Sequence, residues 1–174
     1  MIIKKVIQVG NPIIRSKSKK VVIYSRENQV IIKNLIDSMR YHGLVGMAAP
    51  QIGINERIFV SEIRKTKIRK QKDLDPVRVF INPKILSYSR EKVFGYEGCG
   101  SVAASGLFAN VKRSRSVTIE AFNEKGKKIE LRVIGLLARI IQHEVDHLEG
   151  RVFLDRLSNM QSLMSRDEYL ARSK

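Results

Sequence analysis

The feature that most constrains this chain is the run Gln142-His143-Glu144-Val145-Asp146-His147. In an α-helix, residues four positions apart lie on one face, so His143 and His147 would present two imidazoles to the same point. That arrangement suits a divalent metal, and Glu144 would be near enough to reach a water on the ion without being a ligand. Apolar residues recur at helical spacing around the run, and Gly150 is of the type that ends helices. The segment therefore predicts a helix that carries two metal ligands.

An amphipathic helix with two solvated histidines would show the same run, so a third ligand must decide between the two interpretations. Phe153 stands where a metzincin has its last histidine, which excludes that class of site. Glu168 lies in the window where a thermolysin-like site has its glutamate, but its neighbours are those of a solvated tail. Cys99 is the single cysteine and has a glycine on each side. A thiolate there would bind a divalent ion strongly and would be kept deprotonated by it.

Two further polar residues lie in unusual surroundings. Glu97 precedes Cys99 by two positions, and we expect it to form a buried bidentate ion pair with Arg139 that pins the cysteine segment to the histidine helix. Gln51 follows a stretch of small residues, and its amide carries a donor and an acceptor suited to polarising a carbonyl. Taken alone, that stretch is better explained as a tight loop between a helix and a strand. His42 is interpreted as a helix-end residue without a metal role.

The length and composition indicate one folded domain over residues 1–174, with a helical C-terminal tail over 158–174. A single cysteine excludes an intramolecular disulfide and fits a reducing compartment. The N-terminus has neither the apolar core of a signal peptide nor the pattern of a transit peptide, and no apolar run approaches the length that spans a bilayer. We therefore expect a cytoplasmic enzyme without a membrane partner.

The net charge of +16, from 33 basic and 17 acidic residues, favours association with polyanions such as RNA. Only 6% of the residues are aromatic, there is no tryptophan, and no motif for base stacking is present. The basic residues are most frequent over 15–20 and 64–72. This predicts general electrostatic attraction, for example to the ribosome, with no DNA partner; a basic solvated exterior explains the charge equally well.

Hydrophobic periodicity predicts a helix from Arg26 to Tyr41 with Ser25 as its N-cap. Strands are expected over 54–63, over 77–81, where Asn82-Pro83 should stop the strand, and over 85–88. A hairpin is expected from residues 117–122 and 128–133. The strands come in runs before the histidine helix, with no alternation of strand and helix. The fold class is therefore α+β, with antiparallel β-sheets packed around a central C-terminal His-Glu-x-x-His helix and an additional N-terminal helix.

Three segments together resemble the peptide deformylase family. They are Val45-Gly46-Met47-Ala48-Ala49-Pro50-Gln51, Glu97-Gly98-Cys99-Gly100-Ser101 and Gln142-His143-Glu144-Val145-Asp146-His147. The family carries corresponding Gly-x-Gly-(apolar)-Ala-Ala-x-Gln, Glu-Gly-Cys-x-Ser and Gln-His-Glu-x-x-Asp-His segments in this order. The resemblance extends to Gly10-Asn11-Pro12 and covers nearly the whole chain.

The resemblance implies hydrolysis of the formyl group from the N-terminal formyl-methionine of nascent polypeptides, a step of N-terminal methionine processing in protein biosynthesis. Cys99, His143 and His147 would hold one ion per chain, Fe²⁺ in the family, with Zn²⁺, Ni²⁺ or Co²⁺ able to replace it. Glu144 would be the general base and then the acid. By analogy with the family, Gln51 and the backbone N–H of Gly100 would stabilise the negative charge on the formyl oxygen.

The same resemblance predicts the residues that bind the substrate. The methionine side chain would lie against Val45, Leu136 and Ile140, and an extended peptide would be held by backbone around Val45-Gly46 and Glu97-Gly98, beside Arg139. In some family members the C-terminal segment contacts the ribosome, which the basic charge would suit.

The chain departs from the family pattern near the expected substrate. Leu44 stands where the family usually has Gly, Gly100 where it usually has Leu, and Ala103 where many members have Pro. The stretch from Cys99 to Val111 is also two residues longer than the common pattern. We expect an active enzyme with an atypical rate and peptide preference. The alternatives are a metallopeptidase that uses Glu168 as its third ligand and a ribosome- or RNA-binding protein that has kept only the fold.

Overall fold

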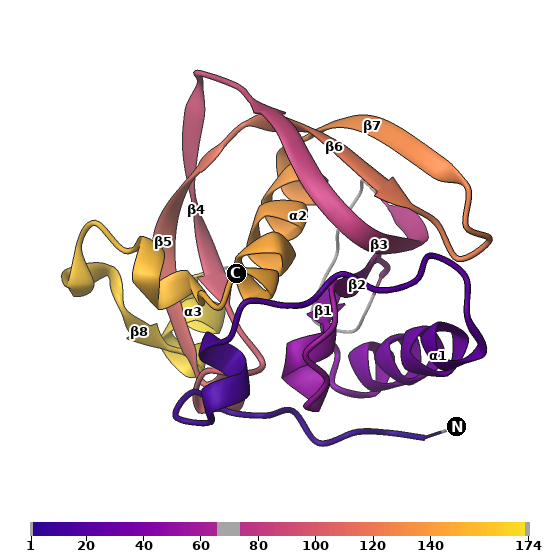
Figure 1. Ribbon diagram of the computed structural model, residues 1–174. Helices are drawn as coiled ribbons and strands as arrows, with labels where there is room; N and C mark the ends of the chain where they lie inside the picture. Colours follow the sequence, from indigo (N-terminus) through magenta and orange to yellow (C-terminus); the bar gives the residue numbers. More distant parts are fainter. Residues whose placement is uncertain (1, 66–73, 173–174) are drawn as a thin grey trace.

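Two antiparallel sheets enclose the helix that carries the histidines (Figure 1). The structure is a computed structural model and describes residues 2–65 and 74–172, so most of the expected basic cluster at 64–72 lies outside the described residues. The larger sheet has the strand order β1-β2-β3-β6-β7, and the smaller sheet has the order β4-β5-β8. The helices are α1 (Arg26–Tyr41), α2 (Gly135–Leu148) and α3 (Arg166–Arg172). The strands are β1 (Gly46–Ala48), β2 (Ile58–Ile63), β3 (Asp75–Tyr88), β4 (Lys92–Gly98), β5 (Leu107–Ser114), β6 (Ser116–Phe122), β7 (Lys128–Ile134) and β8 (Met164–Ser165).

The N-terminal helix begins and ends where the sequence predicts. The Ser25 hydroxyl accepts a hydrogen bond from the backbone N–H of Asn28 at 3.1 Å, which satisfies one of the free donors of the first turn. The apolar face of α1 packs on one side of the larger sheet, against Ile58 and Val60 of β2. This fixes the position of the segment that follows α1 and leads into β1.

The larger sheet is buried on both faces at β2. Phe59 points away from α1, stacks on Phe80 at a centroid distance of 4.5 Å, and belongs to the core formed with α2. The alternation expected for this strand is therefore present, but both faces are apolar because a helix covers each of them. The expected hairpin is confirmed: β6 pairs with β7 in continuous register from Ser116↔Ile134 to Phe122↔Lys128.

The prediction that Asn82-Pro83 stops a strand is wrong, because β3 continues through this pair to Tyr88. Asn82 has a φ of 50°, and the pairing with β6 shifts register between Ile81 and Lys84, which is the signature of a bulge. The bulge accommodates the missing N–H of the proline. The side chain of Asn82 in turn bonds to both backbone groups of Val21, which anchors the loop before α1.

The smaller sheet presents the cysteine segment to α2. Strands β4 and β5, which the sequence reading does not assign, pair without interruption from Lys92↔Ser114 to Gly98↔Phe108. Gln142 of α2 bonds to the N–H and C=O of Ser114, at 3.1 and 2.9 Å, and so joins the helix to β5. Cys99, which directly follows β4, is thereby held opposite the histidine face of α2.

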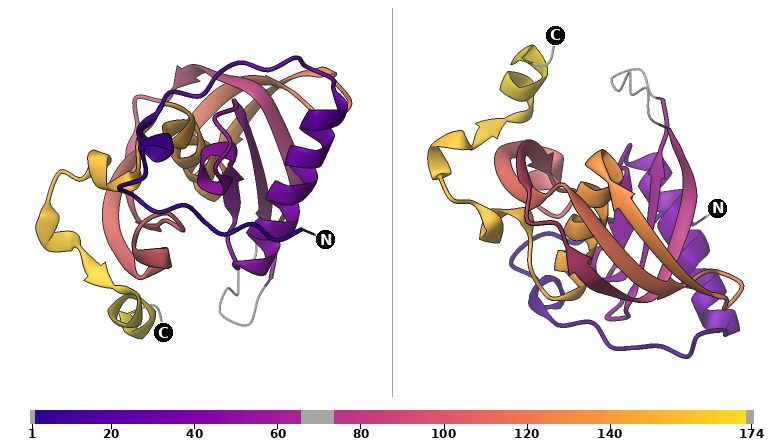
Figure 2. Two further views of the ribbon diagram at one scale, coloured as in Figure 1. Left: turned by 60° about the horizontal axis from the view of Figure 1, so that its bottom comes forward. Right: turned by 90° about the horizontal axis from the view of Figure 1, so that it is seen from above.

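The C-terminal segment runs along the smaller sheet and ends in α3, which projects from the rest of the molecule beside the β4–β5 hairpin (Figure 2). Within the range 158–174, where a helical tail is expected, helix α3 occupies Arg166–Arg172 and is preceded by the short strand β8, which pairs with β5. Among the described residues, no helix combines the length and the apolar character needed to cross a membrane.

Candidate metal centre

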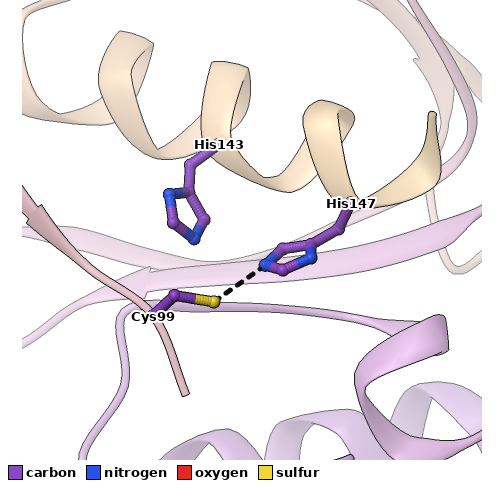
Figure 3. Close-up of side chains that lie close together, drawn as sticks. All are labelled: Cys99, His143 and His147. Atoms are coloured by element: carbon purple, nitrogen blue, oxygen red, sulfur yellow. Dashed lines mark hydrogen bonds between the residues drawn. The ribbon is translucent and has the colours of Figure 1, made fainter. Parts of the chain in front are cut away.

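Three side chains from two distant parts of the chain converge below α2. His143 and His147 point from successive turns of the helix toward Cys99 (Figure 3). Their ligand atoms all lie within 4.8 Å of one another, and Cys99 Sγ is 3.2 Å from His147 Nε2. Cys99 and His147 are almost completely buried, with 2% and 1% of their surface exposed. Among the described residues, Cys99, His143 and His147 are the histidine, cysteine and acidic side chains that lie close enough together to share one ion. Glu168, the alternative third ligand, does not belong to this group.

The donor set fits a divalent transition metal. Glu97 Oε2 lies 3.0 Å from His143 Nδ1, so Nε2 is the nitrogen left to bind an ion. Among the described atoms, buried Glu144 Oε2 has no hydrogen-bond partner, which is the condition expected of a site built around a further group. One thiolate and two imidazoles are ligands that Zn²⁺ and Fe²⁺ accept, and such a set leaves a position open for water.

The surroundings shift the pKa values of the thiol and of the neighbouring carboxyl. Burial disfavours the Cys99 thiolate, but the imidazoles of His147 and His143 outweigh it and lower the pKa of Cys99 to about 5. Burial raises the pKa of Glu144 to about 7, against the opposing influence of the two histidines. A carboxyl that gains and loses a proton near neutral pH is suited to general acid–base catalysis.

A buried network of charges fixes Glu97, the residue that orients His143. Arg113 of β5 forms a bidentate pair with the Glu97 carboxylate, with both N–O distances 2.9 Å, and also donates to Asp146. Burial opposes ionisation of Glu97, yet Arg113 and His143 hold the pKa of its carboxyl well below the ordinary value. Asp146 is bound in addition by Arg156. The network therefore ties β4, β5 and α2 together directly behind the two imidazoles.

The bidentate pair was expected between Glu97 and Arg139, and this expectation is wrong in its geometry. Arg139 contributes one hydrogen bond of 2.8 Å to Glu97 Oε1. The same atom, Nη1, also contacts the backbone carbonyls of Gly95 on β4 and Val111 on β5, and Nη2 donates to the carbonyl of Val93 on β4. Arg139 thus connects α2 to the backbone of the smaller sheet, while Arg113 forms the bidentate pair.

Gln51 is held with its N–H₂ group toward the cysteine. Its Oε1 accepts from the backbone N–H of Ala48 at 2.8 Å, which fixes the amide, and its Nε2 lies 3.8 Å from Cys99 Sγ and 3.4 Å from Ser101 Oγ. The Gly100 carbonyl accepts from Gln8, which fixes the peptide that follows Cys99. A donor with its orientation set in advance can stabilise negative charge that develops during a reaction.

A cleft of about 950 Å³ opens onto this centre. Every site residue expected from the sequence lines the cleft except His147, which is buried in contact with Cys99. The lining includes Val45, Gly46, Gln51, Glu97, Gly98, Cys99, Gly100, Leu136, Arg139, Ile140, His143 and Glu144. Gly46 touches the carboxylate so closely that a Cβ atom there would lie 2.8 Å from Glu144 Cδ. Glycine at this position therefore allows Glu144 its place at the centre of the cleft.

The two departures at Leu44 and Gly100 lie in contact with each other. A Cβ atom on Gly100 would be 3.0 Å from Leu44 Cδ1, so the leucine side chain fills the space beside the glycine. Leu44 is not among the described non-glycine residues with positive φ, and its backbone therefore needs no glycine. The family pattern usually has Gly at position 44 and Leu at position 100. In this chain the leucine and the glycine stand the other way round.

The lengthened stretch after Cys99 forms a left-handed turn at the mouth of the cleft. Ala103, Ala104 and Ser105 have φ values of 47°, 49° and 66°, a region that favours glycine. The turn is held by bonds from Ser105 N–H to the Cys99 carbonyl and from Ala104 N–H to Gln8. These hydrogen bonds stabilise the turn and offset the cost of its unfavourable backbone conformation.

The sequence reading missed Arg113 and Asp146 as supporting residues and α3 as part of the cleft. Arg113 follows Ala109 and Val111 at alternating positions of one strand, so its charge falls on the buried face. A basic residue on the same strand face as buried apolar residues is the sequence pattern that could have predicted a buried ion pair. Nothing in the sequence of α3 indicates that Arg166, Tyr169 and Leu170 line the cleft.

Comparison with known proteins gives consistent results. A family model described as "Polypeptide deformylase" matches residues 3–163. The peptide deformylase of Pseudothermotoga lettingae is 40% identical over 153 residues, which cover 88% of this chain and 82% of the relative. The peptide deformylase of Desulforudis audaxviator is 37% identical over 160 residues, which cover 92% and 97%.

Solved structures agree with the sequence relatives. A crystal structure of the class I type b peptide deformylase from Acinetobacter baumannii with bound Met-Ala-Ser has a TM-score of 0.85 at 30% identity, and covers 90% of this chain and 99% of that one. The peptide deformylase from Thermotoga maritima has a TM-score of 0.79 at 30% identity, and covers 91% and 100%.

Proposed function

The chain belongs to the polypeptide deformylase family, and from this premise we propose which of its residues carry out each part of the family's reaction. The activity is metal-dependent hydrolysis of the formyl group from the N-terminal formyl-methionine of nascent polypeptides, with release of formate. The observation that carries the assignment of residues is the convergence of Cys99, His143 and His147 on one point beside Glu144.

Cys99, His143 and His147 hold one divalent ion per chain. We propose Fe²⁺ as the native ion, with Zn²⁺, Ni²⁺ or Co²⁺ able to replace it. When bound there, the ion supplies a Lewis acid that lowers the pKa of water and polarises a carbonyl. Glu97 fixes the tautomer of His143 through its bond to Nδ1, and Arg113 keeps Glu97 ionised.

Glu144 moves the protons of the reaction. It takes a proton from the attacking water and passes it to the departing amine of methionine, and its buried position in the cleft next to the ligand His143 supports both steps. The N–H₂ group of Gln51 and the backbone N–H of Gly100 donate to the formyl oxygen as it gains negative charge. The bond from Ala48 to Gln51 Oε1 supports this role, because it orients the amide before substrate arrives.

The substrate binds as an extended strand between two sheet edges. β1 and β4 are the terminal strands of their sheets, and both line the cleft. Unpaired backbone groups on an edge strand can bind an extended peptide. We assign the backbone of Val45-Gly46 and of Glu97-Gly98 to this role and the side chains of Val45, Leu136 and Ile140 to the methionine pocket. The Glu97 carboxylate is occupied by Arg113 and His143, so only its main chain is available to the peptide.

The test is turnover of formyl-Met-Ala by Fe²⁺-loaded protein under anaerobic conditions, beside Glu144→Ala. We expect formate release by the wild-type protein and an inactive variant with full metal content. Absence of turnover by the metal-loaded wild-type protein would contradict the assignment.

We also propose that the protein acts in the cytoplasm and associates with the ribosome through its basic surface or C-terminal segment. The support is the net charge of +16. Cosedimentation with ribosomes should weaken as the salt concentration rises. A protein that stays in the supernatant at low ionic strength would contradict this association.

A further inference from the structure

The N-terminal segment joins the two loops that carry the proposed donors to the formyl oxygen. The backbone N–H of Ile7 donates to the carbonyl of Gln51 at 2.8 Å, and the N–H of Val9 donates to the carbonyl of Ser101 at 2.8 Å. The residue between these two backbone bridges is Gln8, which lines the cleft. Its side chain is therefore placed where it can act on the loop that follows the cysteine.

The side-chain amide of Gln8 binds three backbone groups. Its Nε2 donates to the carbonyls of Gly100 and Val6, at 2.9 and 3.1 Å, and its Oε1 accepts from the N–H of Ala104 at 2.9 Å. Turning the amide over would place its N–H₂ group against an N–H and its oxygen against two carbonyls. The partners therefore fix a single orientation of this amide.

The bridged stretch is a part of the chain that needs external support. Gly100 has no side chain to restrain its backbone, and four residues later Ala104 has a φ of 49°. The Gln8 amide lies between the carbonyl of Gly100 and the N–H of Ala104 and bonds to both. It thus restrains the two ends of a loop whose own residues restrain it little.

The bond to the Gly100 carbonyl also directs an N–H group toward Cys99. The Gly100 carbonyl and the Ser101 N–H belong to one planar trans peptide group, so they point in opposite directions. Gln8 binds the carbonyl on one side, and on the other side the Ser101 N–H donates to Cys99 Sγ at 3.4 Å. Rotation of this peptide group would remove the N–H from the sulfur and change the backbone angles of Gly100.

We propose that Gln8 is a positioning residue for the reaction, whose side-chain amide holds the Gly100 backbone so that its N–H can donate to the formyl oxygen. The inference rests on the proposed function and adds to it a residue of the N-terminal segment. Position 100 usually carries leucine in the family, and here the Gln8 amide supplies a restraint from outside the loop. A donor that is fixed before the charge develops stabilises the transition state, and so raises kcat.

The first experiment measures kcat and KM for formyl-Met-Ala with metal-loaded Gln8→Met and Gln8→Glu proteins. Methionine keeps the length of the side chain without the amide, and kcat should fall by about tenfold while KM changes less than about twofold. An ionised glutamate can still accept from Ala104 but cannot donate to the Gly100 carbonyl. Its kcat should fall at least as far as that of Gln8→Met.

The second experiment does not depend on turnover. In Co²⁺-loaded protein, the absorption band that arises from charge transfer between the Cys99 sulfur and the ion reports on hydrogen bonds to that sulfur. Loss of the Ser101 N–H raises the energy of the sulfur electrons, so the band of Gln8→Met should lie at longer wavelength than that of the wild-type protein. Metal content should be one ion per chain in both.

The matched control is Gln29→Met. Gln29 likewise donates to a distant backbone carbonyl, that of Glu124 at 2.8 Å, but does not line the cleft. This change should leave kcat and the Co²⁺ band as they are in the wild-type protein.

An unchanged kcat or an unchanged band in Gln8→Met would overturn the role of Gln8 and leave the proposed function in place. A Gln8→Glu protein with wild-type kcat would do the same, as would a control that loses as much kcat as Gln8→Met. No hydrolysis of formyl-Met-Ala by the metal-loaded wild-type protein would overturn the proposed function, and the role of Gln8 with it.

Discussion

The two ends of the cleft are built in different ways. At the inner end, buried charged groups form a closed network, in which Glu97 binds Arg113, Arg139 and His143. At the outer end, aromatic side chains from separate segments meet at the mouth, with Tyr169 against Phe108. The inner end fixes the side chains proposed to react, and the outer end presents an apolar surface to the cleft.

The two ends of the cleft should tolerate substitutions to different degrees. Breaking a buried charge network leaves a partner without compensation, which costs far more than the loss of one apolar contact at a surface. We therefore expect substitutions to have large effects at the inner end and small effects at the outer end.

The largest effect is expected for Glu144→Gln, which keeps the shape of the side chain but cannot accept and return a proton. The turnover of formyl-Met-Ala should fall by about 10³-fold or more. Metal content measured on the same sample should remain at one ion per chain. A variant with more than a tenth of the wild-type activity would show that another group moves the proton.

Arg113→Met compares a buried ion pair with an exposed one. Removal of a buried partner should lower the free energy of unfolding by about 3–5 kcal/mol, because Glu97 and Asp146 lose a shared cation. The matched change Arg115→Met removes a pair in which 59% and 58% of the side-chain surfaces are exposed, and should cost less than about 1 kcal/mol. Chemical denaturation of both variants measures the difference. Equal losses would contradict the distinction between the two environments.

Gly46→Ala should lower kcat/KM by about 10²-fold, because the new methyl group would overlap the Glu144 carboxylate and push it out of its position. The control is the same change in Glu144→Gln protein. There it should have little further effect, since two residues acting at one point are not additive. A full additional loss in that background would mean that Gly46 acts through something other than Glu144.

Leu44 and Gly100 provide a reciprocal test in the wall beside the metal centre. Gly100→Leu alone should lower kcat/KM by about tenfold, because its Cβ atom would press on Leu44 Cδ1. Adding Leu44→Gly should restore most of the loss, and the double-mutant cycle measures this coupling. A double variant whose loss equals the product of the two single losses would show that the two positions are independent.

The smallest effect is expected in the turn at the cleft mouth. Ala104→Gly should raise the free energy of unfolding by up to about 1 kcal/mol, because the φ of 49° and ψ of 42° favour glycine. The comparison is Ala171→Gly in α3, where the backbone is helical and no gain is expected. A destabilised Ala104→Gly protein would contradict the strain inferred for this turn.

The metal centre at the inner end could be predicted from the sequence because its residues lie in short segments with a recognisable spacing. The four-residue spacing of His143 and His147 has one geometric meaning on a helix, and Cys99 is the single thiol of the chain. Ser25 and the apolar period after it likewise predict α1 to the residue.

The remaining features depend on contacts between distant segments. Whether Glu97 forms its bidentate pair with Arg113 or Arg139 is decided by the register of β4 on β5. The continuation of β3 through Asn82-Pro83 depends on a bulge whose side chain binds Val21. The position of α3 over Phe108 depends on the pairing of β8 with β5, and a two-residue strand carries almost no sequence signal.

The most direct test is a crystal structure of the Zn²⁺-loaded protein with anomalous diffraction measured at the zinc absorption edge. We predict one peak per chain, about 2.3 Å from Cys99 Sγ and about 2.1 Å from Nε2 of His143 and of His147, with Glu144 outside the ligand shell. An ion bound without Cys99, or one whose shell is completed by Glu144 or Glu168, would contradict the proposed centre.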